Sequence, residues 1–387
     1  MELNELTKEI EVCAYCPLMC KNMCCFHSAA KNESSAPTMK NLLLDWSQKD
    51  RIELKEISGV MYQCTLCGQC TQWCEEKRDI PNNMIAARAE IVNRNMAPAE
   101  VKEVEQSTVQ HHNPFGKKQG KRSEGVSLDT NHEASDNIFL FVGCTTAHYQ
   151  ENILDAFGKI TAAAGVKVQT LQEDEWCCGL PQYKLGLKKN AVELAQHNVQ
   201  ALSEQNCQTL LFICPTCYSA FRDFYSEWGI EMKFEVKFIS EYILDLIDKS
   251  RIVLNKDMAG TLTYHDPCAL ARPLKATKNS DVCNEGVVEE PRDILKKIPG
   301  VDFVEMRWNR EKSFCCGGDV ATRLTYPQVS AEIGKKAIDE AVKVEADYLV
   351  TSCPACNRQF IDVLDSSEGK QKIEVLSLCE IVANSIE

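Results

Sequence analysis

The sequence contains one cysteine pattern twice, and this repeat constrains the fold and the chemistry more than any other feature. Each copy has a lone cysteine, a vicinal Cys-Cys-Gly run and a Cys-Pro-x-Cys run. The first copy comprises Cys144, Cys177, Cys178, Cys214 and Cys217, and the second comprises Cys268, Cys315, Cys316, Cys353 and Cys356. A simple cubane iron-sulfur cluster needs four cysteines, so five thiols in each copy imply an unusual cluster or a spare ligand.

The spacing within the two copies is also regular. The vicinal pair precedes the Cys-Pro-x-Cys run by 36 residues in the first copy and by 37 in the second. The lone cysteine precedes the vicinal pair by 33 and by 47 residues. We expect the extra length of the second copy to be a surface insertion in the polar stretch 275–293.

Short apolar runs precede four of the cysteine groups. They cover residues 138–142, 210–213, 261–264 and 348–350. They alternate with amphipathic helical patterns, for example over 188–205 and 328–344, and this alternation indicates parallel strands in βαβ units. Open α/β sheets bind ligands at the carboxyl ends of their strands. We therefore expect these cysteine groups to gather at such an edge.

Each Cys-Pro-x-Cys run leads into a predicted helix, which begins near Tyr218 in the first copy and near Asn357 in the second. Proline is well tolerated in a first helical turn. The unpaired N–H groups of that turn favour thiolates and anionic clusters. Metal binding is therefore electrostatically easy at both positions.

The N-terminal third carries a different signature. Cys64, Cys67, Cys70 and Cys74 have the spacing of bacterial ferredoxins, in which three thiolates hold one cubane cluster and the fourth serves the partner cluster. The proline that usually follows is replaced by Glu75. This run predicts a 4Fe-4S cubane.

A looser version of the same spacing lies upstream, in Cys13, Cys16, Cys20 and Cys24, and Cys25 follows at once. A second 4Fe-4S cubane is the economical interpretation, and spacing alone favours Cys24 as the fourth ligand. The alternative for both runs is a four-thiolate zinc site, which needs two C-x2-C pairs held apart rather than four crowded thiols.

The expected fold class is a multidomain α plus α/β chain. β-branched runs are few before residue 100, and helices are predicted within 34–50 and over 83–95. The predicted parts are a helical two-cluster ferredoxin-type domain over 1–104, a linker over 105–136, and repeated α/β domains over 137–255 and 256–387. We expect His111, His112 and the basic stretch 117–122 of the linker to be solvated.

Composition narrows the class of protein. A chain of 387 residues suggests two or three domains, and a net charge of -13 argues against nucleic-acid binding. Apolar runs never approach 18 residues and the N-terminus lacks a secretory h-region, so direct membrane insertion and export are not expected. The expected location is the cytoplasm, where a partner subunit could hold the protein at a membrane. In that reducing compartment, 22 cysteines favour metal ligation over a disulfide scaffold.

Four cysteines remain after these assignments, namely Cys25, Cys207, Cys283 and Cys379. Cys207 and Cys379 lie on predicted helices and are expected to be buried thiols. Cys283 falls in the insertion and has no predicted role.

The doubled pattern resembles the CCG domains of heterodisulfide reductases, and the whole arrangement is similar to the D-type subunit of that family. It also resembles the iron-sulfur subunits of glycolate oxidase and anaerobic glycerol-3-phosphate dehydrogenase. The phrase Tyr-His-Asp-Pro-Cys at 264–268 is close to the family's phrase before the lone cysteine. The run 269–272 and Asp319 depart from the family pattern, and both lie close to cluster cysteines.

The resemblance implies that each five-cysteine set holds a noncubane 4Fe-4S cluster and that a disulfide is split between the two. Two cubane and two noncubane clusters would then use 18 cysteines. His265 and Arg272 are the candidate catalytic residues, His265 as a proton donor and Arg272 as a partner for an anionic substrate. Arg323 and Arg358 also follow cluster cysteines closely, but for them and for Arg272 a surface or structural role fits at least as well. His148 could donate protons as well, and the alternative for His265 is a hydrogen-bonded structural role.

Two functions remain open. In the first, electrons enter through the cubanes and the paired noncubane clusters reduce a disulfide or thiol-linked substrate. In the second, the chain only relays electrons from a flavin dehydrogenase or flavoprotein to a quinone or other acceptor. No G-x-G-x-x-G run follows a strand, so a flavin would belong to a partner. The expected partners are subunits of a redox complex, such as a flavoprotein, a ferredoxin-like protein or a quinone-reactive membrane cytochrome.

Overall fold

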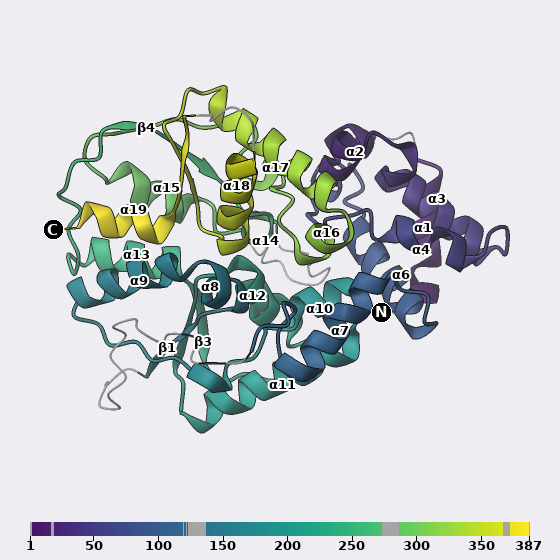
Figure 1. Cartoon of the computed structure of the whole chain (residues 1–387), viewed down its shortest axis with the longest axis horizontal. Coiled ribbons are helices and arrows are strands. Elements are labelled where there is room, and N and C mark those ends of the chain that lie inside the picture. The colour runs from purple at the N-terminus through teal and green to yellow at the C-terminus, as the bar shows by residue number, and fades with distance from the viewer. Residues whose placement is uncertain are drawn as a thin grey trace.

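The structure is a computed structural model that describes residues 2–16, 19–118, 120, 122, 137–272, 286–366 and 372–386. It combines a helical N-terminal part with two parallel β-sheets, each flanked by helices (Figure 1). Cys283 and most of the predicted linker lie outside the described residues. Within the described residues, no helix is both long and apolar enough to cross a membrane.

The N-terminal part contains helices and short helical turns only, among the residues described there. Its α-helices are α1 (Thr7–Ala14), α2 (Cys25–Ala30), α3 (Pro37–Gln48), α4 (Leu54–Met61), α5 (Gln69–Gln72), α6 (Ile80–Asn93) and α7 (Ala99–His111), with 3-10 turns η1 (Leu3–Leu6), η2 (Met19–Met23) and η3 (Glu33–Ser35). The helices predicted within 34–50 and over 83–95 are confirmed as α3 and α6. Helix α6 begins where the Asp79 side chain accepts a hydrogen bond from the Asn82 N–H, with Pro81 in the first turn. Helix α7 continues to His111, so the start of the predicted linker is helical.

The first α/β unit has three parallel strands in the order β1-β2-β3. The elements are β1 (Ile138–Phe141), α8 (Cys144–Tyr149), α9 (Glu151–Ala163), η4 (Gln172–Asp174), α10 (Leu180–Leu185), α11 (Lys188–Glu204), β2 (Thr209–Phe212), α12 (Pro215–Ser219), the π turn η5 (Ala220–Phe224), β3 (Glu235–Phe238) and α13 (Ile239–Asp248). In the register, Phe139 pairs with Leu210 and Leu211 with Lys237. An isolated parallel bridge joins Phe139 to Gln169 on the other side of β1.

The second α/β unit has four parallel strands in the order β5-β4-β6-β7. The elements are β4 (Gly260–His265), α14 (Cys268–Ala271), α15 (Glu289–Lys296), β5 (Val301–Phe303), η6 (Arg310–Lys312), α16 (Val320–Thr325), α17 (Pro327–Val342), β6 (Tyr348–Thr351), α18 (Pro354–Ser366), β7 (Glu374–Ser377) and α19 (Leu378–Ser385). Strand β5 pairs with β4 at the edge of this sheet. In the first unit the corresponding place beside β1 is taken by the isolated bridge at Gln169. The predicted parallel strands are confirmed, and so are the helices predicted over 188–205 and 328–344, as α11 and α17.

The two vicinal cysteine pairs are followed by glycine for the same reason. Gly179 and Gly317 have φ angles of 81° and 79°, which disfavour other residues. A Cβ atom at Gly179 would lie 2.5 Å from the carbonyl oxygen of Ala191, and one at Gly317 would lie 2.7 Å from that of Ser330. In both units the glycine turn therefore packs closely against the following long helix, α11 or α17. This contact holds the vicinal cysteines in position.

Three apolar cores hold the parts together. One joins the N-terminal helices to the first sheet and includes Ile10, Met84 and Phe141. A second lies between the two sheets and is covered by α9, α13, α15 and α19. A third buries the other face of the second sheet, around Leu349 and Phe360. Because the first two cores each span two parts of the chain, all three parts pack as one body (Figure 1).

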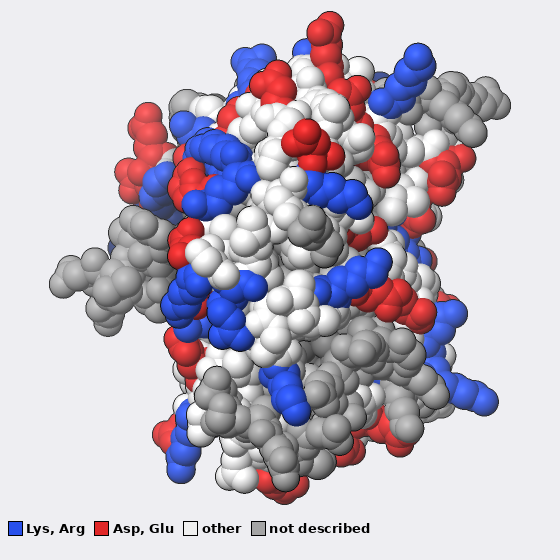
Figure 2. Space-filling view, turned by 90° about the vertical axis from the view of Figure 1, so that its left-hand side faces the viewer, with Lys and Arg blue, Asp and Glu red and all other residues white. Residues whose placement is uncertain are grey.

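The outer face formed around α9, α13 and α19 carries charges of both signs. Figure 2 shows Lys and Arg side chains interspersed with Asp and Glu over this face. A nucleic-acid-binding face would carry a continuous basic surface. The described part of this face offers none, in keeping with the net charge of -13.

Candidate metal centres

The five cysteines of the first copy form one contiguous buried group. The Sγ atoms of Cys144 and Cys177 are 4.0 Å apart. Thiol contacts continue from Cys177 to Cys178, then to Cys217 and finally to Cys214. Burial opposes ionisation of Cys178, but hydrogen bonding to the thiols of Cys177 and Cys217 lowers its pKa to about 6. Cys178 therefore favours the thiolate form, which is the form that binds metal, whereas contacts with neighbouring thiols and burial raise the pKa of Cys144 and Cys217.

The second copy repeats this arrangement. The Sγ atoms of Cys316 and Cys356 are 3.0 Å apart, and these contacts together with Cys315 lower the pKa of Cys316 to about 6. Cys268 contacts Cys315, and Cys353 contacts Cys356. The N–H groups of the glycines at 317 and 318 donate to the sulfur atoms of Cys315 and Cys316. Crowded thiols with backbone donors fit an anionic iron-sulfur cluster.

The Cys-Pro-x-Cys runs sit differently from the expectation. Helices α12 and α18 begin at Pro215 and Pro354, earlier than the predicted starts near residues 218 and 357. Proline occupies the first helical position, where its missing N–H costs nothing. The second cysteine of each run, Cys217 or Cys356, therefore lies in the first turn with its side chain among the other thiols.

The two five-cysteine sets face one pocket between the α/β units. Nine of the ten cysteines line it, and the remaining one, Cys177, contacts Cys144 and Cys178 of the lining. The cysteines that line it are Cys144, Cys178, Cys214, Cys217, Cys268, Cys315, Cys316, Cys353 and Cys356. A molecule in this pocket would contact both sets at once.

The N-terminal cysteines form two groups, and the fourth cysteine of each sequence run belongs to the group of the other run. Cys13 and Cys20 interact electrostatically with Cys16 and with Cys74. The other group brings Cys24 to Cys64, Cys67 and Cys70, which line one enclosed pocket with it. Burial raises the pKa of Cys13 to about 12, and that of Cys24 to about 11. Ionisation of these thiols is unfavourable without a nearby positive charge. A bound metal would supply that charge, so the raised pKa values are compatible with metal ligation.

Cys25 lines the same pocket as Cys24, and its thiol also contacts the second five-cysteine set. Its Sγ atom is 3.9 Å from that of Cys67 and 3.4 Å from the Thr65 hydroxyl oxygen. The sulfur atoms of Cys25, Cys67 and Cys315 all lie within 4.8 Å of one another. The N-terminal group and the second five-cysteine set are therefore in direct contact through Cys67 and Cys315.

His265 is buried at the end of β4 beside the second set. One of its ring nitrogens lies within 4.8 Å of the sulfur atoms of Cys316 and Cys356. Among the described residues its Nε2 atom has no hydrogen-bond partner, and its ring packs edge-on against Phe360. Burial lowers the pKa of His265 to about 4, so the ring is neutral near pH 7. A neutral ring with a free nitrogen can donate to a sulfur atom of a cluster.

Arg272 has a different environment from the one expected of a substrate-binding residue. It is 1% exposed and does not line the cysteine pocket. Its guanidinium group donates to the carbonyl oxygens of Cys67 at 2.7 Å, Glu311 at 3.0 Å and Ser313 at 2.8 Å. These contacts tie the loop after Cys268 to the N-terminal part.

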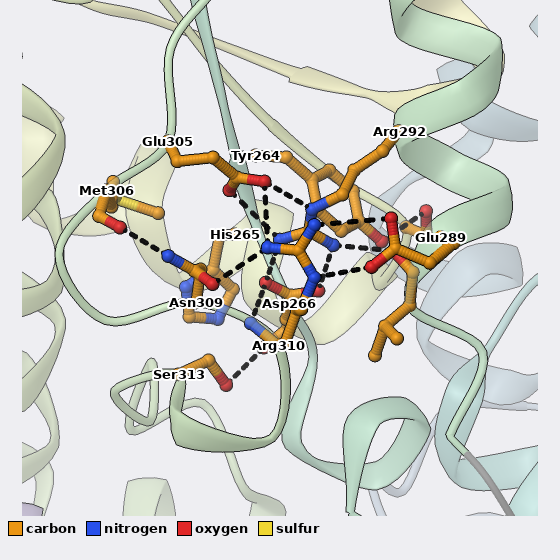
Figure 3. A network of polar contacts seen from close by, with 12 residues as sticks. Tyr264, His265, Asp266, Glu289, Arg292, Glu305, Met306, Asn309, Arg310 and Ser313 are labelled. Carbon is orange, nitrogen blue, oxygen red and sulfur yellow. Dashed lines mark hydrogen bonds and ion pairs between the residues drawn. The ribbon is translucent and has the colours of Figure 1, made fainter.

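Sequence patterns gave no signal for Arg292, which falls in the stretch expected to be a surface insertion. It is fully buried in α15 and donates two hydrogen bonds of 2.7 Å to the Asp266 carboxylate (Figure 3). Asp266 also accepts from the Arg310 N–H, and its carbonyl oxygen accepts from the Ser313 hydroxyl. Glu305 binds the other edge of Arg292. The network fixes the turn that leads into Cys268.

A buried ion pair, also missed, joins the two α/β units across the cysteine pocket. Lys184 of α10 lies 3.6 Å from the Asp319 carboxylate at the start of α16. Both line the pocket. Burial lowers the pKa of Lys184, but Asp319 and the Cys268 and Cys315 sulfurs together raise it above its ordinary value. Lys184 therefore carries a positive charge.

The other candidate residues lie outside the cysteine pocket. Arg323 and Arg358 line a second groove, which shares Thr145, Gly318, Val320 and Ala355 with the cysteine pocket. Arg358 stacks over the Tyr149 ring at 3.4 Å, and Arg323 donates to Gln359. Burial lowers the pKa of His148 to about 4. The groove thus adjoins the cysteine pocket through these four shared residues.

The remaining predictions have mixed outcomes. Cys207 and Cys379 are buried as expected, but Cys207 lies in the turn after α11 rather than on a helix. His112 is not simply solvated, because its ring stacks on Trp176 at 3.6 Å. Arg122 of the basic stretch is buried against Glu175.

Comparison with known proteins supports this interpretation of the cysteines. The cysteine-rich (CCG) domain family matches residues 138–222 and 262–361. The D-type subunit of dihydromethanophenazine:CoB-CoM heterodisulfide reductase from Methanosarcina barkeri is 33% identical over 339 residues, which are 86% of this chain and 80% of that protein. EtfAB:quinone oxidoreductase of Syntrophomonas wolfei is 23% identical over 93% of this chain and 51% of its own length.

A solved structure shares the fold alone. The crystal structure of a hypothetical protein from Helicobacter pylori covers 89% of this chain and 66% of its own, with a TM-score of 0.56 and 10% identity. The sequence matches carry the relationship, since they extend over the cysteine groups and most of the chain. The chain belongs to the family of D-type heterodisulfide reductase subunits, which are iron-sulfur oxidoreductases, and its two α/β units are cysteine-rich domains of the CCG type.

Proposed function

We propose that this chain is the iron-sulfur subunit that reduces a disulfide or thiol-linked substrate in the pocket between its two CCG domains. The observation that carries the proposal is that nine of the ten CCG cysteines line one pocket. A relay needs only one path through the protein. Two complete five-cysteine sets that face a common space suit a reaction that needs two electrons at one substrate bond.

The cysteine groups are arranged in series, which supports an order of electron flow. The group of Cys13 is followed by the group of Cys64, then by the second CCG set through Cys67 and Cys315, and last by the first set across the pocket. Bound in these four groups, two cubane and two noncubane 4Fe-4S clusters would supply one-electron transfer steps. The residues supply the spacing and the shielding from water.

The residues around the pocket have assignable roles under this proposal. His265 is the donor that orients or stabilises sulfur at the second set, through its unpaired buried nitrogen. Arg272 is a positioning residue, which holds the turn after Cys268 on the N-terminal part. Arg323 and Arg358 line the approach to the pocket and suit a substrate with negative charge.

The partner is proposed to dock where the first N-terminal group reaches the surface. Cys16 is exposed, and Tyr15 and Val12 beside it are exposed apolar residues. An electron donor subunit would bind there and pass electrons to the first cysteine group. Such a subunit could be a flavoprotein, a ferredoxin-like protein or a quinone-reactive cytochrome. The chain would work in the cytoplasm, with any attachment to a membrane through that partner.

A relay without substrate chemistry is the second candidate. It is favoured by Asp319, which fills part of the pocket with Lys184, and by the similarity to an EtfAB:quinone oxidoreductase. Under this alternative the series of thiol groups is unchanged, but the pocket receives no disulfide.

Metal content and the response to thiols separate these functions. We expect the anaerobically purified protein to contain about 16 irons and an equal amount of acid-labile sulfide. A thiol added with a mild oxidant should induce a new EPR signal, because a thiol bound between the CCG sets changes a cluster's ligation. The same iron content with no thiol response would favour the relay, and zinc with little iron would contradict both functions.

The neighbouring Cys24 and Cys25 should behave differently. Cys24→Ser is expected to lose about four irons, because Cys24 faces Cys64, Cys67 and Cys70. Cys25→Ser is expected to keep them, because the Cys25 sulfur lies within 4.8 Å of those of Cys67 and Cys315, at the junction with the second set, and the ligand spacing favours Cys24. Iron analysis of both variants, with Cys379→Ser as the buried-thiol control, tests the assignment. Iron loss in Cys25→Ser but not in Cys24→Ser would reverse it.

A further inference from the structure

The cysteine pocket has a single cationic side chain among the described residues that line it, and that side chain is Lys184. It belongs to the first CCG domain but faces the second, since its nitrogen lies 3.6 Å from the Asp319 carboxylate and it lines the pocket together with Cys268 and Cys315. Lys184 lies six residues after Cys178, and the residue six positions after Cys316 is Thr322. The second copy of the pattern therefore has no lysine at the matching position. The charge of the pocket is therefore asymmetric.

The N-terminal part holds Lys184 in place. Arg88 donates to the Lys184 carbonyl oxygen at 2.9 Å, and the Tyr62 hydroxyl donates to that of Leu185 at 3.1 Å. Gly186 ends α10 in a left-handed conformation, where a Cβ atom would lie 2.5 Å from the Arg88 backbone. Lys184 thus lies near the end of α10, where the backbone is held by the N-terminal part. Its side chain is only 6% exposed.

Asp319 occupies only part of the bonding capacity of Lys184. One Asp319 oxygen accepts from the Ala321 N–H and caps α16, and the other lies 3.6 Å from the ammonium nitrogen. An ammonium group has three donors, so two remain for a group in the pocket. A buried cation of this kind stabilises negative charge strongly because the surroundings are poorly polarisable.

We propose that Lys184 is a catalytic residue that binds the thiolate leaving group when a disulfide is reduced in this pocket. The inference rests on the proposed function, which supplies the two electrons. The S–S bond breaks, the two electrons occupy the two sulfur atoms, and two thiolates form. The two electrons come from reduced iron-sulfur clusters held by the cysteine groups. Lys184 pairs with one thiolate without giving up a proton, and each thiolate takes a proton from water after release.

The test uses the anaerobic holoprotein with reduced viologen and two probes, neutral bis(2-hydroxyethyl) disulfide and dianionic dithiodiglycolate. Lys184→Gln should lower kcat about 100-fold for both probes, with iron and sulfide contents unchanged. Lys184→Arg and Asp319→Asn keep the cation and should retain at least about a third of kcat. The exposed Lys189→Gln is the matched control. Calorimetric binding of the product 2-mercaptoethanol should weaken about tenfold in Lys184→Gln only.

Four results would overturn the inference. An unchanged kcat in Lys184→Gln would remove the catalytic role. A loss confined to KM for dithiodiglycolate would make Lys184 an anchor for substrate charge. An equal loss in Asp319→Asn would make the pair a clamp between domains. If the unaltered protein reduces neither probe, the proposed function fails and the inference fails with it.

Discussion

Removal of iron by a chelator should abolish the cooperative unfolding transition of this protein. The two CCG sets face one pocket between the α/β units, Cys67 contacts the second set, and 12 of the 18 predicted ligands are buried. When metal is bound, the free energy of binding adds to the free energy of folding. Without metal, the crowded thiols contribute little packing to hold the parts together. Thermal unfolding followed by near-UV circular dichroism should show a sharp transition in the holoprotein and none after anaerobic chelation.

Reconstitution provides the control for this result. Iron and sulfide returned to the chelated protein should restore the transition together with the visible absorbance, which excludes damage by the chelator. The apolar cores give the competing expectation, because the core between the sheets contains no predicted cluster ligand. A chelated protein that keeps a cooperative transition would show that these cores suffice for folding.

The α/β repeat was predictable because its signals are local. Apolar runs before Cys144 and Cys353, and helical periodicity over α11 and α17, each depend on a few neighbouring residues. The cysteine spacing then placed the thiols at the carboxyl ends of strands, where the structure has them. Local patterns of this kind survive folding because they are satisfied within one βαβ unit.

The contacts between parts were not predictable, because they depend on residues far apart in the sequence. Arg292 belongs to a polar stretch in the sequence, and only α15 brings it against Asp266. Lys184 lies in an ordinary short helix, and only the packing of α10 against α16 puts it beside Asp319. Arg272 follows a cluster cysteine and suggests substrate binding, yet it binds backbone carbonyls of the N-terminal part. Charge along the sequence does not say which partner a cation will meet.

Replacement of Arg292 by Met should destabilise the protein by about 3–5 kcal/mol, because it leaves the Asp266 carboxylate buried without its ion-pair partner. Both side chains are almost fully buried, at 0% and 1% exposure. The remaining donor to that carboxylate is the Arg310 N–H. For a protein of 387 residues the unfolding temperature of the holoprotein should fall by roughly 5 °C.

The same substitution should also reach the second CCG set, since Asp266 lies two residues before Cys268 in the turn that the network fixes (Figure 3). Arg310→Met is the matched control, because the Arg310 side chain is partly exposed and its ion pairs should contribute about 1 kcal/mol or less. Asp266→Asn combined with Arg292→Met should recover part of the loss, since it removes the unpaired charge. An unfolding temperature of Arg292→Met equal to that of Arg310→Met would mean that water reaches Asp266 and that the network does not hold the turn before Cys268.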